Sequence, residues 1–161
     1  MTVETMHIVI VCTGNTCRSP IAEALARRAF VEYDLSDITV TSAGTGAWDG
    51  APVSEGAYLV GLERHIDLSR HQATLLTREV VNAADLVLTM ARHHRARVEE
   101  LGGGENVHLL GEYAGVMGDE AEVRDPFGGD LEEYRSTFDQ LERLLEPTIA
   151  RIAQELQGDQ G

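Results

Sequence analysis

Hydrophobic residues follow two alternating patterns along this chain, short continuous runs and longer stretches with helical spacing. The first run is Ile8-Val9-Ile10-Val11, and such β-branched residues are typical of a strand buried on both faces of a parallel sheet. The next stretch predicts a helix, with Ser19 as its N-cap and Pro20 suited to its first position. Its apolar stripe consists of Ala22, Leu25, Ala26, Ala29 and Phe30.

The same alternation continues to the end of the chain. Further strands are predicted at 38–41, 85–89 and 107–110. Further helices are predicted at 54–64, 77–83, 91–101 and from 131 into the mid-150s. We expect Ser54 to cap the first of these and Pro147 to kink or interrupt the last. The segment 111–129 has no periodic pattern, and a loop of this length in a small domain is often functional.

Alternating strands and helices define an α/β fold class. Right-handed crossovers would produce a single domain over residues 1–161, with one four-stranded parallel sheet and helices on both faces. A ligand site is expected at the carboxyl ends of the strands. Residues 158–161 are expected to form a frayed tail.

The composition excludes several classes of protein. A net charge of −14 argues against a nucleic-acid binder, which needs a basic surface. No apolar stretch approaches the ~20 residues of a membrane helix, and the N-terminus lacks the pattern of a signal peptide. Two cysteines do not make a disulfide framework. We therefore expect a cytoplasmic protein with no nucleic-acid or membrane partner.

The loop between the first strand and the first helix combines three features that suit phosphate chemistry. It reads Cys12-Thr13-Gly14-Asn15-Thr16-Cys17-Arg18-Ser19. A short loop before a helix directs several backbone N–H groups at one point, where the helix dipole favours an anion. Arg18 adds a planar donor for two phosphate oxygens. The same field favours the thiolate of Cys12, so the sequence predicts a nucleophile beside a bound phosphate.

Cofactor and metal sites are not indicated. Gly44, Gly46 and Gly50 miss the spacing of a dinucleotide-binding loop by one residue and do not directly open a helix. Cys12 and Cys17 have no second pair of ligands at the spacing of a zinc site. We expect no cofactor and no metal.

Cys-x5-Arg-Ser-Pro near the N-terminus, Ser-Ala-Gly-Thr after the second strand and Asp-Pro-Phe in a late loop occur together in this chain. In this combination the chain resembles the low-molecular-weight protein tyrosine phosphatase family over nearly its full length. The resemblance implies that Cys12 is the nucleophile, Arg18 the phosphate clamp and Asp125 the general acid. It also implies that Ser19 can donate a hydrogen bond to the Cys12 sulfur.

The resemblance implies roles for further residues. Asn15, Ser42 and His71 match positions that support the loop, and Trp48 matches an aromatic residue at its mouth. The expected substrate-binding set is Thr13, Gly14, Asn15, Thr16, Cys17, Ser19, Trp48 and Phe127.

Two departures from the tyrosine-specific pattern indicate a branch of the family. Thr16 stands where those enzymes usually have an apolar β-branched residue, and Phe127-Gly128 stands where they usually have two tyrosines. The combination looks like the bacterial protein-arginine-phosphatase branch. It implies phosphorylated proteins as partners and phosphoarginine as the substrate, with Thr16 orienting the phosphoguanidino group. Phosphotyrosine is the alternative substrate.

Two other kinds of protein carry a similar loop. An arsenate reductase would need cysteines after Cys17, and there are none. A non-catalytic phosphate-binding module would need neither a thiolate nor Asp125.

Individual residues of the predicted site could also have simpler roles. Cys17 either fills space beneath the loop or forms a reversible disulfide with Cys12 that protects it from oxidation. Asp125 could shape a turn, Trp48 and Phe127 could be partly buried, and His71 could lie on the surface. His93 and His94 are interpreted as part of a solvated helix face.

Overall fold

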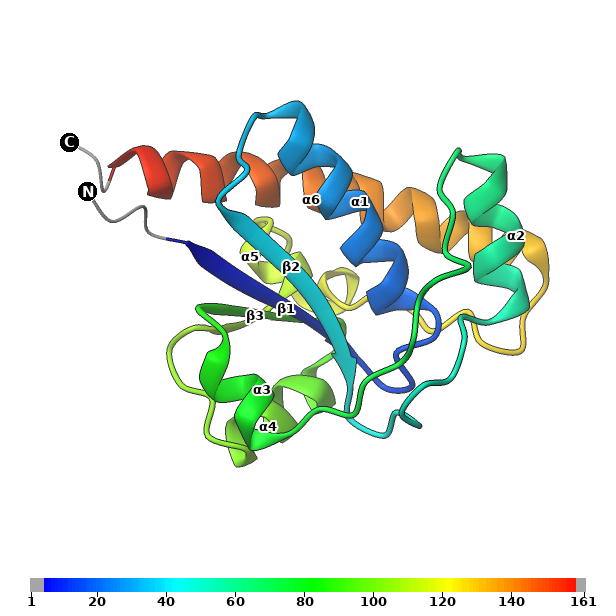
Figure 1. The fold of residues 1–161 in the computed structure, drawn as a ribbon, viewed down its shortest axis with the longest axis horizontal. Helices are drawn as coiled ribbons and strands as arrows, with labels where there is room; N and C mark the ends of the chain where they lie inside the picture. The colour runs from blue at the N-terminus through cyan, green and yellow to red at the C-terminus, as the bar shows by residue number, and fades with distance from the viewer. Residues whose placement is uncertain (1–4, 159–161) are drawn as a thin grey trace.

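The computed structural model describes residues 5–158, in which strands and helices alternate around one sheet (Figure 1). Strand β1 (Met6–Cys12) pairs in parallel with β2 (Ile38–Gly44) on one side and with β3 (Leu86–Thr89) on the other. Strand β4 (Val107–Leu109) pairs in parallel with β3, which completes a 4-stranded sheet in the order β2-β1-β3-β4. The predicted α/β fold with a parallel sheet is confirmed.

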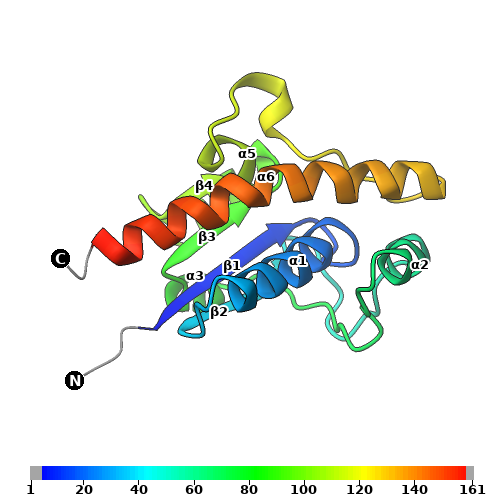
Figure 2. The same ribbon diagram turned by 90° about the horizontal axis from the view of Figure 1, so that it is seen from above.

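Strand β1 is buried on both faces, as its sequence predicts. Ile8 and Ile10 belong to the larger hydrophobic cluster, whereas Val9 and Val11 belong to a second one, because successive side chains of a strand point to opposite faces. Helices α1 (Arg18–Glu32) and α6 (Leu131–Gly158) cover the first face (Figure 2). Helices α3 (Arg78–Ala83) and α4 (Arg92–Glu100) cover the second (Figure 1).

Three short elements complete the fold. Helix α2 (Glu55–Glu63) has the predicted cap, since the Ser54 side chain accepts a hydrogen bond from the Ala57 backbone N–H. The segment predicted to lack regular structure contains part of α5 (Leu110–Tyr113) and a 3₁₀ helix (Gly118–Ala121). Each of these two is only one turn long, which is too short to produce a periodic pattern.

Two predictions about the ends of elements are wrong. The N-cap of α1 is Cys17, and it makes no side-chain capping hydrogen bond; Ser19 and Pro20 therefore lie inside the first turn. Strand β2 does not stop at Thr41 but continues to Gly44, because its pairing with β1 extends to Cys12 opposite Gly44.

Of the two effects expected of Pro147, an interruption of α6 does not occur, because the helix continues from Leu131 to Gly158; a kink stays a prediction. A proline inside a helix removes one backbone hydrogen bond. Leu141 and Leu145 before it, and Ile149 and Ile152 after it, all remain buried in the same core. Packing on both sides of the proline therefore holds the helix together.

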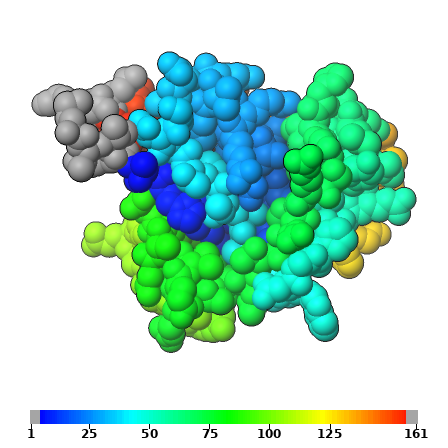
Figure 3. Space-filling view, viewed as in Figure 1, coloured from blue at the N-terminus to red at the C-terminus, as the bar shows by residue number. Residues whose placement is uncertain are grey.

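The loop after β1 lies at the carboxyl end of the sheet, where the chain runs to β2 on one side of β1 and later to β3 on the other. This is the position at which open α/β sheets bind ligands. The segment between α2 and α3 passes beside α1 and the end of β2 (Figure 3) and forms a bridge between Leu75 and Gly44. The segment between α2 and α3 therefore packs against the loop that follows β1.

No helix within residues 5–158 is both long and apolar enough to cross a membrane. Gly158 is the last residue of α6. The other residues of the predicted tail lie outside the described residues.

Candidate active site

In the loop after β1, several carbonyl groups are bonded to neighbouring segments, whereas the amides of residues 13–17 are unpaired among the described residues. Thr45, Gly46 and Ser54 donate backbone hydrogen bonds to the carbonyls of Cys12, Thr13 and Thr16. Within residues 5–158, no backbone N–H of residues 13–17 donates a hydrogen bond to the protein. Unpaired amides next to the start of α1 form a binding site for an anion.

Asn15 fixes the shape of this loop. It is fully buried and has a positive φ of 56°, a conformation that asparagine tolerates better than most residues. Its Oδ1 accepts from the Thr74 backbone N–H at 2.9 Å, and its carbonyl oxygen lies 2.7 Å from His71 Nε2. The loop is therefore held by the segment between α2 and α3, and His71 is half-buried in it rather than free on the surface.

A chain of hydrogen bonds leads from Asn15 to the nucleophile. Asn15 Nδ2 donates to Ser42 Oγ at 2.9 Å and to Ser19 Oγ at 2.8 Å, and Ser42 Oγ donates to Glu23 at 2.7 Å. Because Ser19 Oγ already accepts a hydrogen bond from Asn15, its own O–H is free to point at Cys12 Sγ, 2.9 Å away. Asn15 and Ser42, which were predicted to support the loop, thus lie together with Ser19 behind Cys12.

Gly44 allows the backbone of Thr13 and Asn15 to pack closely against the end of β2. A Cβ atom on Gly44 would lie 2.4 Å from the Thr13 carbonyl oxygen and 2.9 Å from the Asn15 backbone nitrogen. In the sequence this glycine is only a sign of a loop, but in the fold it is the end of β2 against which the loop of residues 13–17, here called the phosphate loop, packs.

Arg18 is buried, with only 4% of its surface exposed. Its Nη1 donates to the Val123 carbonyl at 3.0 Å, and its Nη2 lies 3.5 Å from Thr13 Oγ1 and 3.6 Å from Asp125 Oδ2. Its Nε is buried and has no hydrogen-bond partner among the described residues. The guanidinium group is thus held at one end and has a donor to offer to a bound phosphate.

The segment 123–129 brings a carboxylate over the loop. The Phe127 backbone N–H donates to Asp125 Oδ1 at 3.0 Å, so this oxygen does shape a turn. The other oxygen, Oδ2, faces Arg18. Gly128 has a φ of 81°, a conformation that favours glycine. The turn and the position of the acid are therefore parts of one arrangement.

A cavity of about 220 Å³ lies between the loop and Asp125. It is lined by Cys12, Thr13, Gly14, Thr16, Cys17, Arg18, Asp125 and Phe127. Asn15 and Ser19 lie behind this wall. Trp48 does not line the cavity and is 84% exposed, so it is not a partly buried aromatic residue. Phe127 lines the cavity although it is 72% exposed, which places it at the mouth.

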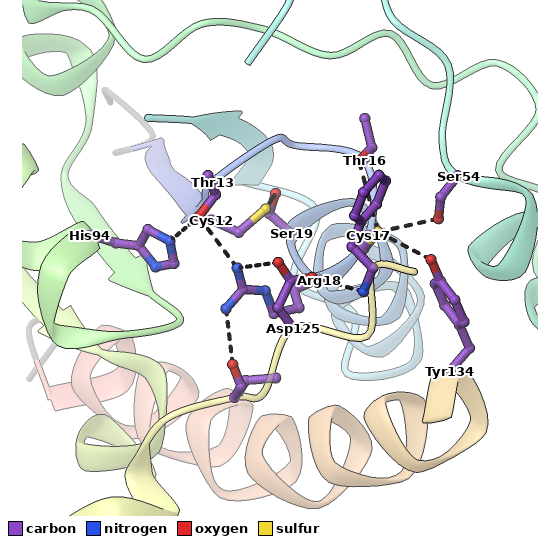
Figure 4. A network of polar contacts seen from close by, with 12 residues as sticks. Cys12, Thr13, Thr16, Cys17, Arg18, Ser19, Ser54, His94, Asp125 and Tyr134 are labelled. Carbon is purple, nitrogen blue, oxygen red and sulfur yellow. Dashed lines mark hydrogen bonds and ion pairs between the residues drawn. The ribbon is translucent and has the colours of Figure 1, made fainter. Parts of the chain in front are cut away.

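The thiol of Cys17 points away from Cys12 (Figure 4). Its Sγ lies 3.2 Å from Ser54 Oγ and 3.6 Å from the Tyr134 hydroxyl. Burial raises the pKa of Tyr134 to about 12, so its phenol stays protonated. Both cysteines are free and buried, and the protective disulfide with Cys12 stays a prediction.

The interpretation of His94 as a solvated residue is wrong. His93 is exposed, but His94 is fully buried, and its Nε2 lies 2.8 Å from Thr13 Oγ1. Burial, together with the positive charge of Arg18 and the neighbouring His93, lowers the pKa of His94 to about 3. The sequence carried a signal for this burial, because Ala91, His94 and Val98 recur at helical spacing and all three are buried.

This neutral histidine predicts a loss of stability in acid. Between pH 6.5 and about 3 the unfolded chain protonates His94 and the folded chain does not, so the free energy of unfolding falls as the pH is lowered. His94→Leu should remove this contribution. When the pH is lowered from 7 to 5, the free energy of unfolding of the variant should rise by about 2 kcal/mol relative to that of the wild type, as measured by urea unfolding. His93→Leu is the control, and an equal gain in both variants would contradict the assignment.

Among the described residues, no group of three or more His, Cys, Asp or Glu side chains could hold a metal ion. The residues that line the cavity include two thiols, a guanidinium group and a carboxyl group, and the unpaired loop amides lie beside them. These groups suit nucleophilic displacement at a phosphate.

Comparison with known proteins agrees with this geometry. A sequence model of the family described as "Low molecular weight phosphotyrosine protein phosphatase" matches residues 7–158. The chain belongs to this family of cysteine-dependent phosphatases.

Particular relatives are similar over almost their whole length. The "Protein-arginine-phosphatase" of Bacillus subtilis is 39% identical over 156 residues, which cover 96% of this chain and 99% of the relative. The "Low molecular weight protein-tyrosine-phosphatase PtpB" of Staphylococcus haemolyticus is 40% identical over 141 residues, covering 87% of this chain and 95% of the relative.

A solved structure shares the fold. It is described as the "YwlE arginine phosphatase", a cysteine-to-serine mutant with a phosphorylated active site serine. It has a TM-score of 0.85 and 38% sequence identity, and the match covers 92% of this chain and 96% of that chain.

Proposed function

We propose that this protein is a protein phosphatase that hydrolyses phosphoarginine through a phosphocysteine intermediate. The observation that carries the phosphatase reaction is the set of unpaired loop amides around Cys12, opposite Asp125. The observation that supports the substrate is Thr16, a residue with a hydroxyl group in the wall of the cavity. We further propose that the protein acts in the cytoplasm, supported by two free cysteines.

In the first step the substrate phosphate lies on the loop amides and on Arg18. The Cys12 thiolate attacks phosphorus, the P–N bond breaks, and Asp125 gives its proton to the departing guanidine nitrogen. Free arginine side chain leaves, and phosphate is bound to sulfur. Developing charge on the phosphoryl oxygens is stabilised by donors that are already oriented, which avoids reorganisation during the reaction.

In the second step a water molecule replaces the leaving group. Asp125, now a carboxylate, takes a proton from this water as its oxygen attacks phosphorus. The P–S bond breaks, the electron pair returns to sulfur and inorganic phosphate leaves. Ser19 stabilises the re-formed thiolate, because its O–H is the group directed at Cys12 Sγ.

The wall of the cavity favours a polar leaving group. Among the described residues, Thr16 Oγ1 has one polar contact, with Cys17 Sγ at 3.8 Å. It is therefore available to accept a hydrogen bond from an N–H of a phosphoguanidino group. Phe127 at the mouth offers an aromatic face to a planar guanidinium group. The relative from Bacillus subtilis that is named a protein-arginine-phosphatase supports the same substrate.

Phosphotyrosine is the second candidate, favoured by the relative named PtpB at 40% identity. Thr16→Ile separates the two substrates. Replacing the hydroxyl with the ethyl group of isoleucine removes a hydrogen-bond acceptor and adds apolar surface. We expect the ratio of kcat/KM for phosphoarginine to that for phosphotyrosine to fall about tenfold or more, measured on matched peptides.

Thr16→Ser is the matched control, because it keeps the hydroxyl and should keep most of the preference. A ratio that does not change in Thr16→Ile would contradict the role of the hydroxyl. The phosphatase reaction itself would still stand in that case.

A further inference from the structure

His94 lies in direct contact with the phosphate loop, although no step of the proposed reaction uses it. It projects from the first turn of α4 toward Thr13, on the side of the loop where Thr13 meets Arg18 (Figure 4). The hydroxyl of Thr13 is therefore shared between a fully buried imidazole ring and the guanidinium group that faces the phosphate site.

We propose that His94 is a positioning residue that, through Thr13, holds the Arg18 guanidinium group in the plane required to bind the phosphoryl group. This inference rests on the phosphate-clamp role proposed for Arg18.

The direction of the hydrogen bonds follows from what each group can do. A guanidinium group only donates, so Thr13 Oγ1 accepts from Arg18 Nη2 at 3.5 Å. The hydroxyl proton of Thr13 is then available for His94 Nε2 at 2.8 Å, which accepts it. In a neutral ring the proton must then be on Nδ1. The imidazole thus fixes the hydroxyl rotamer without adding a positive charge beside Arg18.

The other nitrogen of the ring argues against a purely structural role. His94 Nδ1 is buried and has no hydrogen-bond partner among the described residues. An unpaired buried polar atom weakens a fold, and an apolar residue of similar size would avoid this loss. A histidine here is better explained by what Nε2 does for Thr13 than by packing.

The other contacts of Arg18 do not by themselves fix the orientation of its guanidinium group. Nη1 is fixed by the Val123 carbonyl at 3.0 Å, which alone permits rotation about that contact. Nη2 lies between Thr13 and the exposed carboxylate of Asp125. Because Asp125 must move its proton during the reaction, Thr13 is the neutral contact that can keep Nη2 in place throughout.

A double-mutant cycle tests the proposal. His94→Leu and Thr13→Val should each lower kcat/KM about 10- to 100-fold, and the double mutant should be no less active than the less active single mutant. His94→Gln, whose terminal amide reaches about as far as Nε2, should restore most of the activity. The inhibition constant for vanadate should rise in parallel, whereas the melting temperature of His94→Leu should stay at or above the wild-type value.

His93→Leu is the matched control on the same helix, and it should retain wild-type activity because His93 is exposed. Unchanged activity in His94→Leu, or losses that multiply in the double mutant, would overturn the proposal. A loss of activity with an equal loss of thermal stability, not relieved by His94→Gln, would also overturn it. In that case the histidine would be structural.

A comparison with Arg18→Lys distinguishes a failure of the role of His94 from a failure of the phosphate-clamp role of Arg18. Arg18→Lys should lose both turnover and vanadate binding; if it loses neither, the clamp role itself fails. If Arg18→Lys loses both and His94→Leu loses neither, only the role of His94 fails. Nitrogen NMR of the wild type at pH 7 should find the His94 proton on Nδ1, and a proton on Nε2 would overturn the proposed direction.

Discussion

Cys12→Ser is expected to lose turnover by about 10⁴-fold or more and to retain phosphate from a phosphorylated protein. The hydroxyl group of serine can accept the phosphoryl group at the same point on the loop. Water would not hydrolyse the resulting phosphoserine in the second step, because the serine alkoxide is a much poorer leaving group than a thiolate. A solved relative of this family carries such a phosphorylated serine in place of its active site cysteine.

The measurement is intact-protein mass spectrometry after incubation with a phosphorylated peptide, together with phosphate release. Cys12→Ala is the control, because it has the same loop but no atom that can accept phosphate. Phosphate release by Cys12→Ser at the wild-type rate would contradict the covalent mechanism. Equal phosphate retention by Cys12→Ala would show that the label is not bound to residue 12.

Asp125→Asn is expected to lower kcat by about 10² to 10⁴-fold for phosphoarginine, because the asparagine amide cannot give a proton to the leaving nitrogen. The guanidine group has a pKa of about 12.5 or higher, against about 10 for the phenol of tyrosine, so it depends more strongly on protonation. The loss should therefore be smaller for phosphotyrosine and smallest for 4-nitrophenyl phosphate, whose leaving group needs no proton. Steady-state kinetics with the three substrates measures this order.

Asp130→Asn is the matched control. Asp130 is exposed in the same loop and caps α6, where its Oδ1 accepts from the Glu133 backbone N–H at 3.0 Å. Asparagine caps a helix as well as aspartate does, so this variant should keep its activity. An equal loss for all three substrates in Asp125→Asn would contradict the role of a general acid and would leave Asp125 with its turn-forming contact and its contact with Arg18.

Hydrophobic patterning predicted the sheet because its strands are parallel and covered by helices. The first strand is buried on both faces, and its continuous apolar run, Ile8–Val11, is too short for a buried helix. The ends of elements were less predictable, since they depend on partners far along the chain. Strand β2 reaches Gly44 only because β1 lies beside it, and α6 passes Pro147 only because its stripe packs against the core.

Cys12 and Arg18 could be found from the loop alone, since both residues lie in one short motif. Asp125 lies about 110 residues away, and it was found through a resemblance rather than from its spacing. His94 was missed because basic residues surround it in sequence and suggest a solvated helix. Its burial depends on the phosphate loop that covers it, and this contact exists only in the folded chain.

The backbone contacts of the site could not be predicted either. The Val123 carbonyl holds Arg18, and the Gly44 backbone leaves room for the loop. Backbone atoms are the same in every residue, so a sequence gives little sign of which of them serves a site.

The most direct test of the central claim is phosphate release by the wild-type protein from peptides of one sequence that carry phosphoarginine, phosphotyrosine or phosphoserine. We predict the highest kcat/KM for phosphoarginine and the lowest for phosphoserine, with no release from any of them by Cys12→Ala. A higher kcat/KM for phosphotyrosine than for phosphoarginine, or no turnover of either, would contradict the assignment of this protein as a phosphoarginine phosphatase.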